Sequence, residues 1–295
     1  MNRIDGINWP WMVTQECLDA MKSYDVSEDD VWVVSHPKSG THWTAEMVHM
    51  ILAGGREENI NRPEHWSRPP EFDYSRSDMP PIFERRTSPH YKEIQKWPAP
   101  RVIMTHLTEE RMPSQIYQGK GKVVFVIRNP KDVAVSMWHY VKPWKFDPNL
   151  EDWDYFFQKY LNGETVYGSW FDHILDFWNK HRHDNNFLFI KYEDMKQDIK
   201  TAVTQIAHFL NKPLSEDAIN NICKSCSMGD MSQRFQGRST DEDPRDEPAN
   251  ISVGQVFRKG IVGDWKTKFT VAQNEALDEI FREKMAGSGL KIQFE

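Results

Sequence analysis

Short apolar runs alternate along the chain with longer segments in which apolar residues recur at helical spacing. Each run is rich in β-branched or aromatic residues and ends in a polar cluster, which is typical of a buried strand. We expect strands at Val31–Val34, Arg101–Thr105, Lys122–Ile127 and Phe187–Lys191. This alternation predicts an α/β fold, a central and mainly parallel sheet flanked by helices. Ligands bind beyond the carboxyl ends of such strands, so the polar clusters there are the first candidates for a site.

Two long segments lack this periodicity. Residues 62–100 contain eight of the 17 prolines, and residues 231–256 include the acidic run Asp241–Glu247. Neither segment resembles a flexible linker, and the chain contains no internal repeat. We therefore expect a single domain over residues 1–295, with residues 1–24 as an N-terminal approach segment and the two aperiodic segments as long loops.

Composition narrows the classes of partner. The 295 residues include 37 Lys and Arg against 44 Asp and Glu, a net charge of −7, which argues against broad nucleic-acid binding. A net negative charge is still compatible with a local basic cluster that binds a small anion. No apolar run is long enough to cross a membrane, so we expect no membrane partner. The odd count of three cysteines suits a reducing compartment, and we predict a cytoplasmic protein.

The most informative segment follows the first expected strand. Ser-His-Pro-Lys-Ser-Gly-Thr-His-Trp, residues 35–43, leads from that strand into a segment with helical spacing. A strand, a tight turn and a helix N-terminus together present main-chain N–H groups, hydroxyls and one ammonium to an anion, in a P-loop-like strand–loop–helix. It is not a Walker A sequence, because Lys38 precedes Gly40. On spacing alone, an ordinary strand–helix turn remains the alternative.

Four ordered blocks carry a clear resemblance. They are PKSGTHW at 37–43, RNPKDVAVS at 128–136, YEDM at 192–195 and RKGIVGDWK at 258–266. The chain resembles the cytosolic sulfotransferases of phenols, steroids and alcohols over about residues 25–286. The resemblance implies that the co-substrate is 3′-phosphoadenosine 5′-phosphosulfate (PAPS) and that the product is 3′-phosphoadenosine 5′-phosphate (PAP).

The resemblance also implies a donor site. It assigns the 5′-phosphosulfate to Lys38, Ser39, Gly40 and Thr41, the adenine to Trp43, and the 3′-phosphate to Arg128, Ser136, Arg258, Lys259 and Gly260. His42, Tyr192, Cys226, Met228, Met231 and Phe257 complete the expected site. His42, Cys226 and Met228 depart from the family's usual Thr, Thr and Phe, which puts donor affinity in question.

Catalysis, by the same resemblance, rests on His106 as general base, Lys38 beside the leaving phosphate oxygen, and Ser136. His106 ends the segment PRVIMTHL, and an imidazole titrates near neutrality. Met104 stands where many relatives have a lysine, so a catalytically silent PAPS- or PAP-binding scaffold is an alternative. A P-loop phosphotransferase that uses ATP and Mg²⁺ is a third hypothesis. The lone Cys223-x-x-Cys226 lacks a second ligand pair, so we predict no metal.

The acceptor is the least determined part. We expect a small lipophilic alcohol, phenol, steroid or amine, bound near the two aperiodic segments. Candidate lining residues are Phe83, Met104, His106, Trp138 and Tyr140, with Trp9, Trp11 and Phe235 as further aromatics. The acidic run could favour a cationic acceptor. The residues Lys266, Thr270, Val271 and Glu275 match the family's short dimer motif and predict a homodimer.

Overall fold

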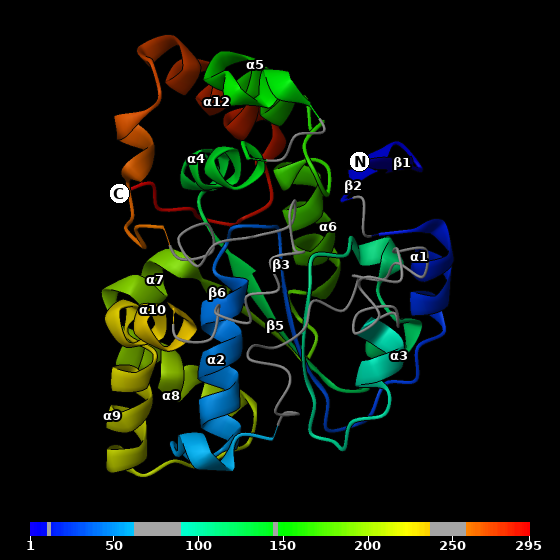
Figure 1. Cartoon of the computed structure of the whole chain (residues 1–295), viewed down its shortest axis with the longest axis vertical. Coiled ribbons are helices and arrows are strands. Elements are labelled where there is room, and N and C mark those ends of the chain that lie inside the picture. Colours follow the sequence, from blue (N-terminus) through cyan, green and yellow to red (C-terminus); the bar gives the residue numbers. More distant parts are fainter. Residues whose placement is uncertain (11–12, 62–89, 144–146, 237–257) are drawn as a thin grey trace.

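The computed structural model describes residues 1–10, 13–61, 90–143, 147–236 and 258–295 (Figure 1), and the side chains of 234–236 are left out of the description. At its centre lie four parallel strands in the order β4-β3-β5-β6. Their bounds are β3 Val31–Ser35, β4 Val102–Thr105, β5 Lys122–Ile127 and β6 Phe187–Lys191. The predicted fold class and all four predicted strands are confirmed, with one-residue shifts at β3 and β4.

Both faces of the sheet are covered, which explains why its strands are almost continuously apolar. Along β3, Trp32 and Val34 join one core while Val31 and Val33 join the other. Phe125 of β5 packs against Phe177 of α6, Trp170–His181, in the first core, with ring centroids 4.7 Å apart. The alternation of successive side chains therefore divides the interior into two cores.

Helices of the second core lie beside α2 in Figure 1. These are α2 Thr41–Leu52, α7 Tyr192–Gln197, α8 Ile199–Phe209, α9 Glu216–Ser225 and α10 Met228–Gln236. Helix α10 extends into the segment that we expected to be aperiodic from Met231 onward. Apolar spacing is weak there, and the preceding Ser227 hydroxyl accepts from the Asp230 N–H in the first turn.

The remaining elements cover the first core and the sheet ends. They are the β1 Asn2–Ile4 and β2 Ile7–Trp9 hairpin, α1 Gln15–Lys22, α3 His90–Ile94, α4 Pro130–Val141, α5 Trp153–Leu161, α6 Trp170–His181 and α12 Val271–Lys284. Short 3₁₀ turns are η1 Glu57–Asn59, η3 Glu109–Arg111, η4 Ser114–Gln118, η5 Pro148–Glu151 and η6 Asp264–Thr267. Helix α3 lies within the proline-rich segment that we expected to be irregular, where the buried Ile94 anchors it in the first core.

In the part of the chain that the structure describes, no helix is long and apolar enough to cross a bilayer.

Candidate active site

The site forms where the strands end. β3 leads through residues 36–40 into α2, β4 into His106, β5 into Arg128 and α4, and β6 into α7. Because the strands are parallel and adjacent, these four connections meet at one edge of the sheet. The topology thus brings together sequence blocks that are far apart along the chain.

The loop between β3 and α2 is shaped to approach a ligand closely. Lys38 and Gly40 have left-handed backbones, with φ of 68° and 103°. A side chain at Gly40 would place its Cβ 2.7 Å from Cδ2 of the Tyr192 ring. The Ser35 and Thr41 hydroxyls lie 2.6 Å apart and tie the two ends of the loop. The loop therefore directs the N-terminus of α2, the positive end of the helix dipole, toward the edge of the sheet.

Ser39 contributes a hydroxyl without a partner. Its Oγ is buried and has no hydrogen bond to any residue that the structure describes. A buried hydroxyl normally has a partner, so this atom needs one from outside the described protein. Lys38 lies beside it in sequence, and its Nζ is 4.5 Å from the centroid of the Tyr140 ring.

Arg128 connects this loop to the segment before η6. Its Nη1 donates to the Lys38 carbonyl at 3.0 Å, and its Nη2 donates to the Ile261 carbonyl at 3.4 Å. The guanidinium carbon lies 4.3 Å from the centroid of the Tyr192 ring. Its Nε has no partner among the described residues. One buried cation thus holds two backbone segments and keeps a donor unused.

Two buried carboxylates, those of Asp132 and Glu193, hold the segment before η6 and the start of α4. Asp132 accepts from the Gly263 and Trp265 N–H groups, each at 2.9 Å, and from the Asn129 side chain at 2.9 Å. Glu193 accepts from the Asn129 main-chain N–H at 2.9 Å, while burial raises the pKa of its carboxyl. Asp132 thus satisfies main-chain groups of the irregular backbone around residue 263, and Glu193 satisfies the N–H before α4.

Asp264 holds the two basic residues of the fourth block. Its carboxylate forms ion pairs with Arg258 and, at 2.7 Å, with Lys259. Burial alone would raise the pKa of Asp264, but the hydrogen bonds from Lys259 and Arg258 outweigh it and hold the pKa below its ordinary value. The Nε of Arg258 has no partner in the described part of the chain.

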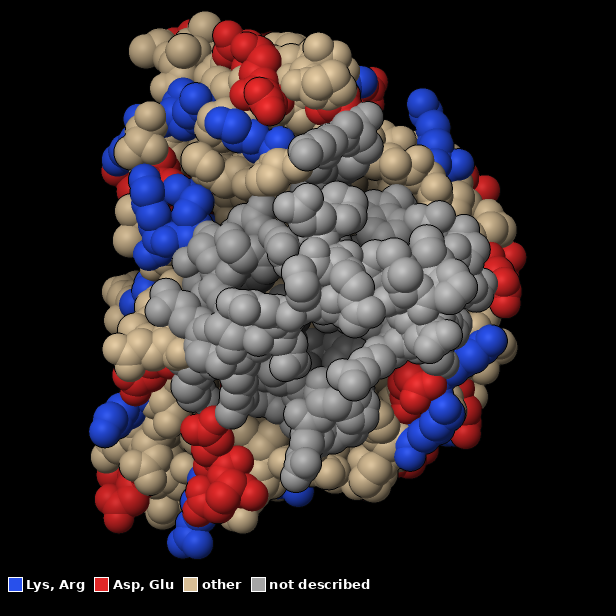
Figure 2. All heavy atoms as spheres, viewed as in Figure 1, with Lys and Arg blue, Asp and Glu red and all other residues tan. Residues whose placement is uncertain are grey.

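Further basic residues surround this block. Lys142 and Lys268 place their Nζ atoms 5.0 and 4.2 Å from the centroid of the Trp138 ring. Burial first, and then the Arg258 charge, lower the pKa of His139. Figure 2 shows Lys and Arg side chains gathered over the region where Figure 1 draws α4 and the segment after residue 258. The site therefore has a positive rim in a chain of net charge −7.

The predicted adenine residues also converge. The Trp43 indole N–H donates to the Cys226 carbonyl at 2.8 Å, and its ring meets the Tyr192 ring at 5.5 Å. Trp43, Tyr192, Cys226 and Met231 belong to the second core. Gly260, with φ of 62°, approaches so closely that an added Cβ would lie 2.7 Å from Cε of Met228. An apolar platform thus lies next to the cationic groups.

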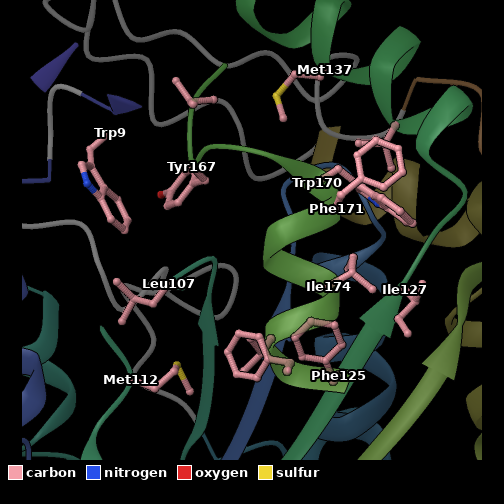
Figure 3. Packing of buried hydrophobic residues seen from close by; sticks show 14 of the residues in the cluster. Trp9, Leu107, Met112, Phe125, Ile127, Met137, Tyr167, Trp170, Phe171 and Ile174 are labelled. Carbon is pink, nitrogen blue, oxygen red and sulfur yellow. The ribbon is translucent and has the colours of Figure 1, made fainter. Parts of the chain in front are cut away.

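His106 follows β4 at the same edge and is 7% exposed. Its Nδ1 lies 2.8 Å from the Ser35 carbonyl, an acceptor, so Nδ1 carries the hydrogen. The neutral ring therefore has its lone pair on Nε2. The ring packs edge-on against Tyr167 at 5.3 Å, and Tyr167 packs edge-on against Trp9 at 5.4 Å. Figure 3 shows the Tyr167 ring pointing toward Trp9.

Several predicted residues lie elsewhere. Trp138 is two positions from Tyr140 on α4 and therefore on the other side of the helix, where its indole N–H donates to the Leu150 carbonyl at 3.0 Å. Met104 is fully buried in the second core. Ser136 lies one helical turn before Tyr140, and His42 lies in the first turn of α2. Trp11, Phe83 and Phe257 lie outside the described residues, as does the Phe235 side chain.

Sequence reasoning missed four residues at this site. Tyr167 packs on His106, Asp132 lies 4.0 Å from the Arg128 guanidinium, and Asp264 pairs with Lys259. Glu193 accepts from Asn129, which follows Arg128 in the sequence. The three acidic residues belong to the sequence blocks at 128–136, 192–195 and 258–266. A buried acid within such a block is a signal for a residue that positions its neighbours. Tyr167 carried no such signal, although its left-handed backbone, with φ of 66°, marks a strained turn.

Comparison with known proteins places this geometry in context. The family model described as sulfotransferase domain matches residues 28–289. Sulfotransferase 1A1 of the dog is 36% identical over 278 residues, which cover 94% of this chain and 90% of that protein. The crystal structure of mouse sulfotransferase SULT7A1 complexed with PAP is 34% identical, with a TM-score of 0.76 and coverage of 97% and 94%. A retinol dehydratase in complex with retinol and PAP shares the fold, with a TM-score of 0.80, 24% identity and coverage of 95% and 89%.

Proposed function

The chain belongs to the sulfotransferase domain family, and on that premise we propose that it transfers the sulfuryl group of PAPS to a hydroxyl or amine of a small lipophilic acceptor. The observation that carries the proposal is the orientation of His106. Its Nδ1 donates to the Ser35 carbonyl, which leaves Nε2 as a proton acceptor at the sheet edge where Lys38 and Arg128 lie.

The residues of this edge fit a donor with two anionic groups. On the first side, beside the N-terminus of α2, the buried Ser39 hydroxyl has no partner among the described residues. On the second, the Nε atoms of Arg128 and Arg258 have no partner in the described part of the chain. At this edge of the sheet, an added Cβ at Gly40 or Gly260 would collide with a neighbouring side chain, and glycine permits a ligand to approach the backbone. PAPS carries its phosphosulfate and its 3′-phosphate at opposite ends of one nucleotide.

In the proposed step, Nε2 of His106 accepts the proton of the acceptor hydroxyl as its oxygen forms a bond to sulfur. The bond between sulfur and the bridging phosphate oxygen breaks, and the electron pair stays on PAP. The Lys38 ammonium stabilises that developing charge, and the α2 N-terminus adds main-chain N–H groups. Positioning and electrostatics thus supply most of the catalysis, as in phosphoryl transfer.

The acceptor class follows from what surrounds His106. Tyr167 and Trp9 form an aromatic path that leads away from the base, with ring separations of 5.3 and 5.4 Å. Aromatic walls with one polar group favour flat lipophilic molecules that carry a hydroxyl. The acceptor is therefore a phenol, a steroid or a similar alcohol, bound beside this path.

Turnover of radiolabelled PAPS with a panel of phenols, steroids, alcohols and amines tests the proposal. We expect His106→Ala to lower kcat by about 100-fold or more, as expected for a lost general base, with PAP affinity retained in calorimetry. His208→Ala, an exposed histidine on α8, is the matched control. Full activity of His106→Ala would refute the assigned base. PAP binding without turnover across the panel would select the silent scaffold instead.

The exposed start of α12 is the proposed contact between two copies of the chain. Val271 at the start of α12 is 76% exposed, and Glu275 lies one turn later on the exposed side. Thr270 caps the helix through a reciprocal pair with Gln273, and Lys266 pairs with Glu295. An apolar side chain on a rigid helix start suits a small two-fold contact between two copies. The chain therefore forms a homodimer through residues 266–275.

A further inference from the structure

Two buried histidines lie beneath His106. His36 follows β3 directly, and His173 lies in the first turns of α6. Their exposed fractions are 0% and 2%. Neither belongs to the residues that we assigned to the donor or to the chemistry. A buried histidine is commonly a satisfied core residue, so the contacts of each ring decide its role.

His173 contacts the backbone of the general base itself. Its Nε2 lies 3.2 Å from the His106 carbonyl, which can only accept, so Nε2 carries the hydrogen. The His106 ring is held from the other side, because its Nδ1 donates to the Ser35 carbonyl. The base is thus fixed at its backbone by α6 and at its ring by β3.

His36 extends this connection to the turn before α6. Its Nε2 lies 3.5 Å from the Gly168 carbonyl, at the outer limit of a hydrogen bond. Gly168 follows Tyr167, whose ring packs on His106. The His36 and His173 rings meet edge to face, with centroids 5.6 Å apart and planes at 83°. The two rings therefore join the loop after β3, the end of β4 and the start of α6.

Both rings favour the neutral form. Burial lowers the pKa of His36 and of His173; the His173 and His106 charges lower it further at His36, and the His106 charge lowers it further at His173. The Nδ1 atoms have no partner among the described residues, as expected for lone pairs that face a dry interior. Neutral rings hold the base through directed hydrogen bonds and add no charge beside it.

We propose that His36 and His173 are a positioning pair for the general base, which fixes His106 and the Tyr167 turn relative to the loop between β3 and α2. The proposal rests on the role of His106 in the proposed function. Its physical basis is the sensitivity of proton transfer to geometry, because a displacement of about 1 Å can cost about 100-fold in rate.

Paired amide variants separate positioning from packing. His173→Gln places its amide nitrogen four bonds from Cα, as Nε2 is, and can still donate to the His106 carbonyl. His173→Asn is one methylene shorter and cannot reach it. We expect His173→Asn to lower kcat about 10- to 100-fold, with the PAP Kd changed less than about twofold, and His173→Gln to restore most of kcat. His36→Gln and His36→Asn, toward Gly168, form a second pair with the same expectation.

The outcomes are distinct. Three results would each overturn the proposal. They are a wild-type kcat in His173→Asn, an equal loss of kcat in both amide variants, and a parallel loss of kcat and PAP affinity. His208→Gln controls for loss of an exposed imidazole, and thermal unfolding checks that each variant is folded. Wild-type turnover and His106→Ala report separately on the proposed function. The ratio of the Gln to the Asn variant reports on the positioning pair.

Discussion

The guanidinium of Arg128 donates a 3.0 Å hydrogen bond to the main-chain carbonyl of Lys38. The second arm of the same fork donates to the Ile261 carbonyl. These carbonyls belong to the two segments that we assign to opposite ends of the donor. One side chain therefore sets the distance between the two anion sites.

Arg128→Lys should weaken donor binding sharply. Lysine keeps the charge but has no planar fork, so it cannot hold both carbonyls. We expect the PAP Kd to rise about 10- to 100-fold, as for the loss of one or two charged hydrogen bonds. Calorimetry measures the Kd. Arg182→Lys, an exposed arginine after α6, is the matched control, and an unchanged Kd in Arg128→Lys would contradict the connecting role.

Gly40→Ala and Gly54→Ala compare the two ends of α2. Both glycines have left-handed backbones, with φ of 103° and 65°, so both variants bear the same kind of backbone strain, about 1–2 kcal/mol. At Gly54 the new Cβ meets nothing within 4 Å, whereas at Gly40 it meets the Tyr192 ring at 2.7 Å. We expect Gly40→Ala alone to lose PAP affinity, by at least about tenfold, as the ring is displaced from the site. Equal affinities in the two variants would show that the contact is unimportant.

Asp132→Ala should destabilise the fold. The substitution leaves the partly buried N–H groups of Gly263 and Trp265 without their acceptor, and each such group costs about 1–3 kcal/mol when it is shielded from water. We expect the free energy of unfolding in urea to fall by about 3 kcal/mol. Asp217→Ala, an exposed acid in α9, should change it by less than about 1 kcal/mol. A loss in Asp132→Ala as small as in this control would argue against the anchoring role.

The histidine pair makes stability depend on pH in a defined direction. Burial, followed by the His106 charge, lowers the pKa of His173 from 6.5 to about 4, and His36 shifts in the same direction. The unfolded chain therefore binds more protons between these values. The stabilisation is complete above about pH 6.5 and is lost as the pH falls toward about 4, by an amount on the order of 3 kcal/mol for His173.

His173→Gln isolates that contribution. Carboxylates also titrate in this range, so the informative quantity is the difference between the wild type and the variant. We expect that difference in the free energy of unfolding to shift in favour of the variant as the pH is lowered from about 7 to about 4. Parallel pH curves for the two proteins would be inconsistent with a buried neutral His173.

Val271→Glu should dissociate the proposed dimer. A two-fold contact brings the same residue of both copies together, so the variant would place two negative charges close to each other. We expect light scattering to report a dimer for the wild type and a monomer for Val271→Glu, with turnover retained. Ala286→Glu, beyond the far end of α12, should remain dimeric. A monomeric wild type would refute the assembly.

The strands were predictable because both sheet faces are buried, so each strand is a continuous apolar run that hardly any other element would produce. The strand–loop–helix over residues 35–43 was predictable from local order in the sequence. Helical spacing could also have excluded one of the predicted pairs of acceptor residues. Trp138 and Tyr140 are two positions apart on α4 and cannot face the same ligand.

The contacts around His106 were not predictable in the same way. Its partners are the carbonyl of Ser35, the ring of Tyr167 and the imidazole of His173, which come from three distant parts of the chain. A main-chain carbonyl has no signature in the sequence, and a tyrosine or histidine in an aromatic-rich chain is usually core. These contacts required the register of the sheet and the placement of α6.

The turn that carries Tyr167 is paired with the N-terminal hairpin, since the Tyr167 N–H donates to the Asn8 carbonyl at 2.8 Å and residues 8 and 166 form a β-bridge. During synthesis, Asn8 leaves the ribosome long before residue 167 exists, so this wall of the site cannot close until more than half of the chain has emerged. Contacts of such sequence separation form late, because the entropy of a long loop must be lost before the contacts contribute favourable free energy. The proposed acceptor side is therefore expected to form after β3 and α2 have formed the loop between them.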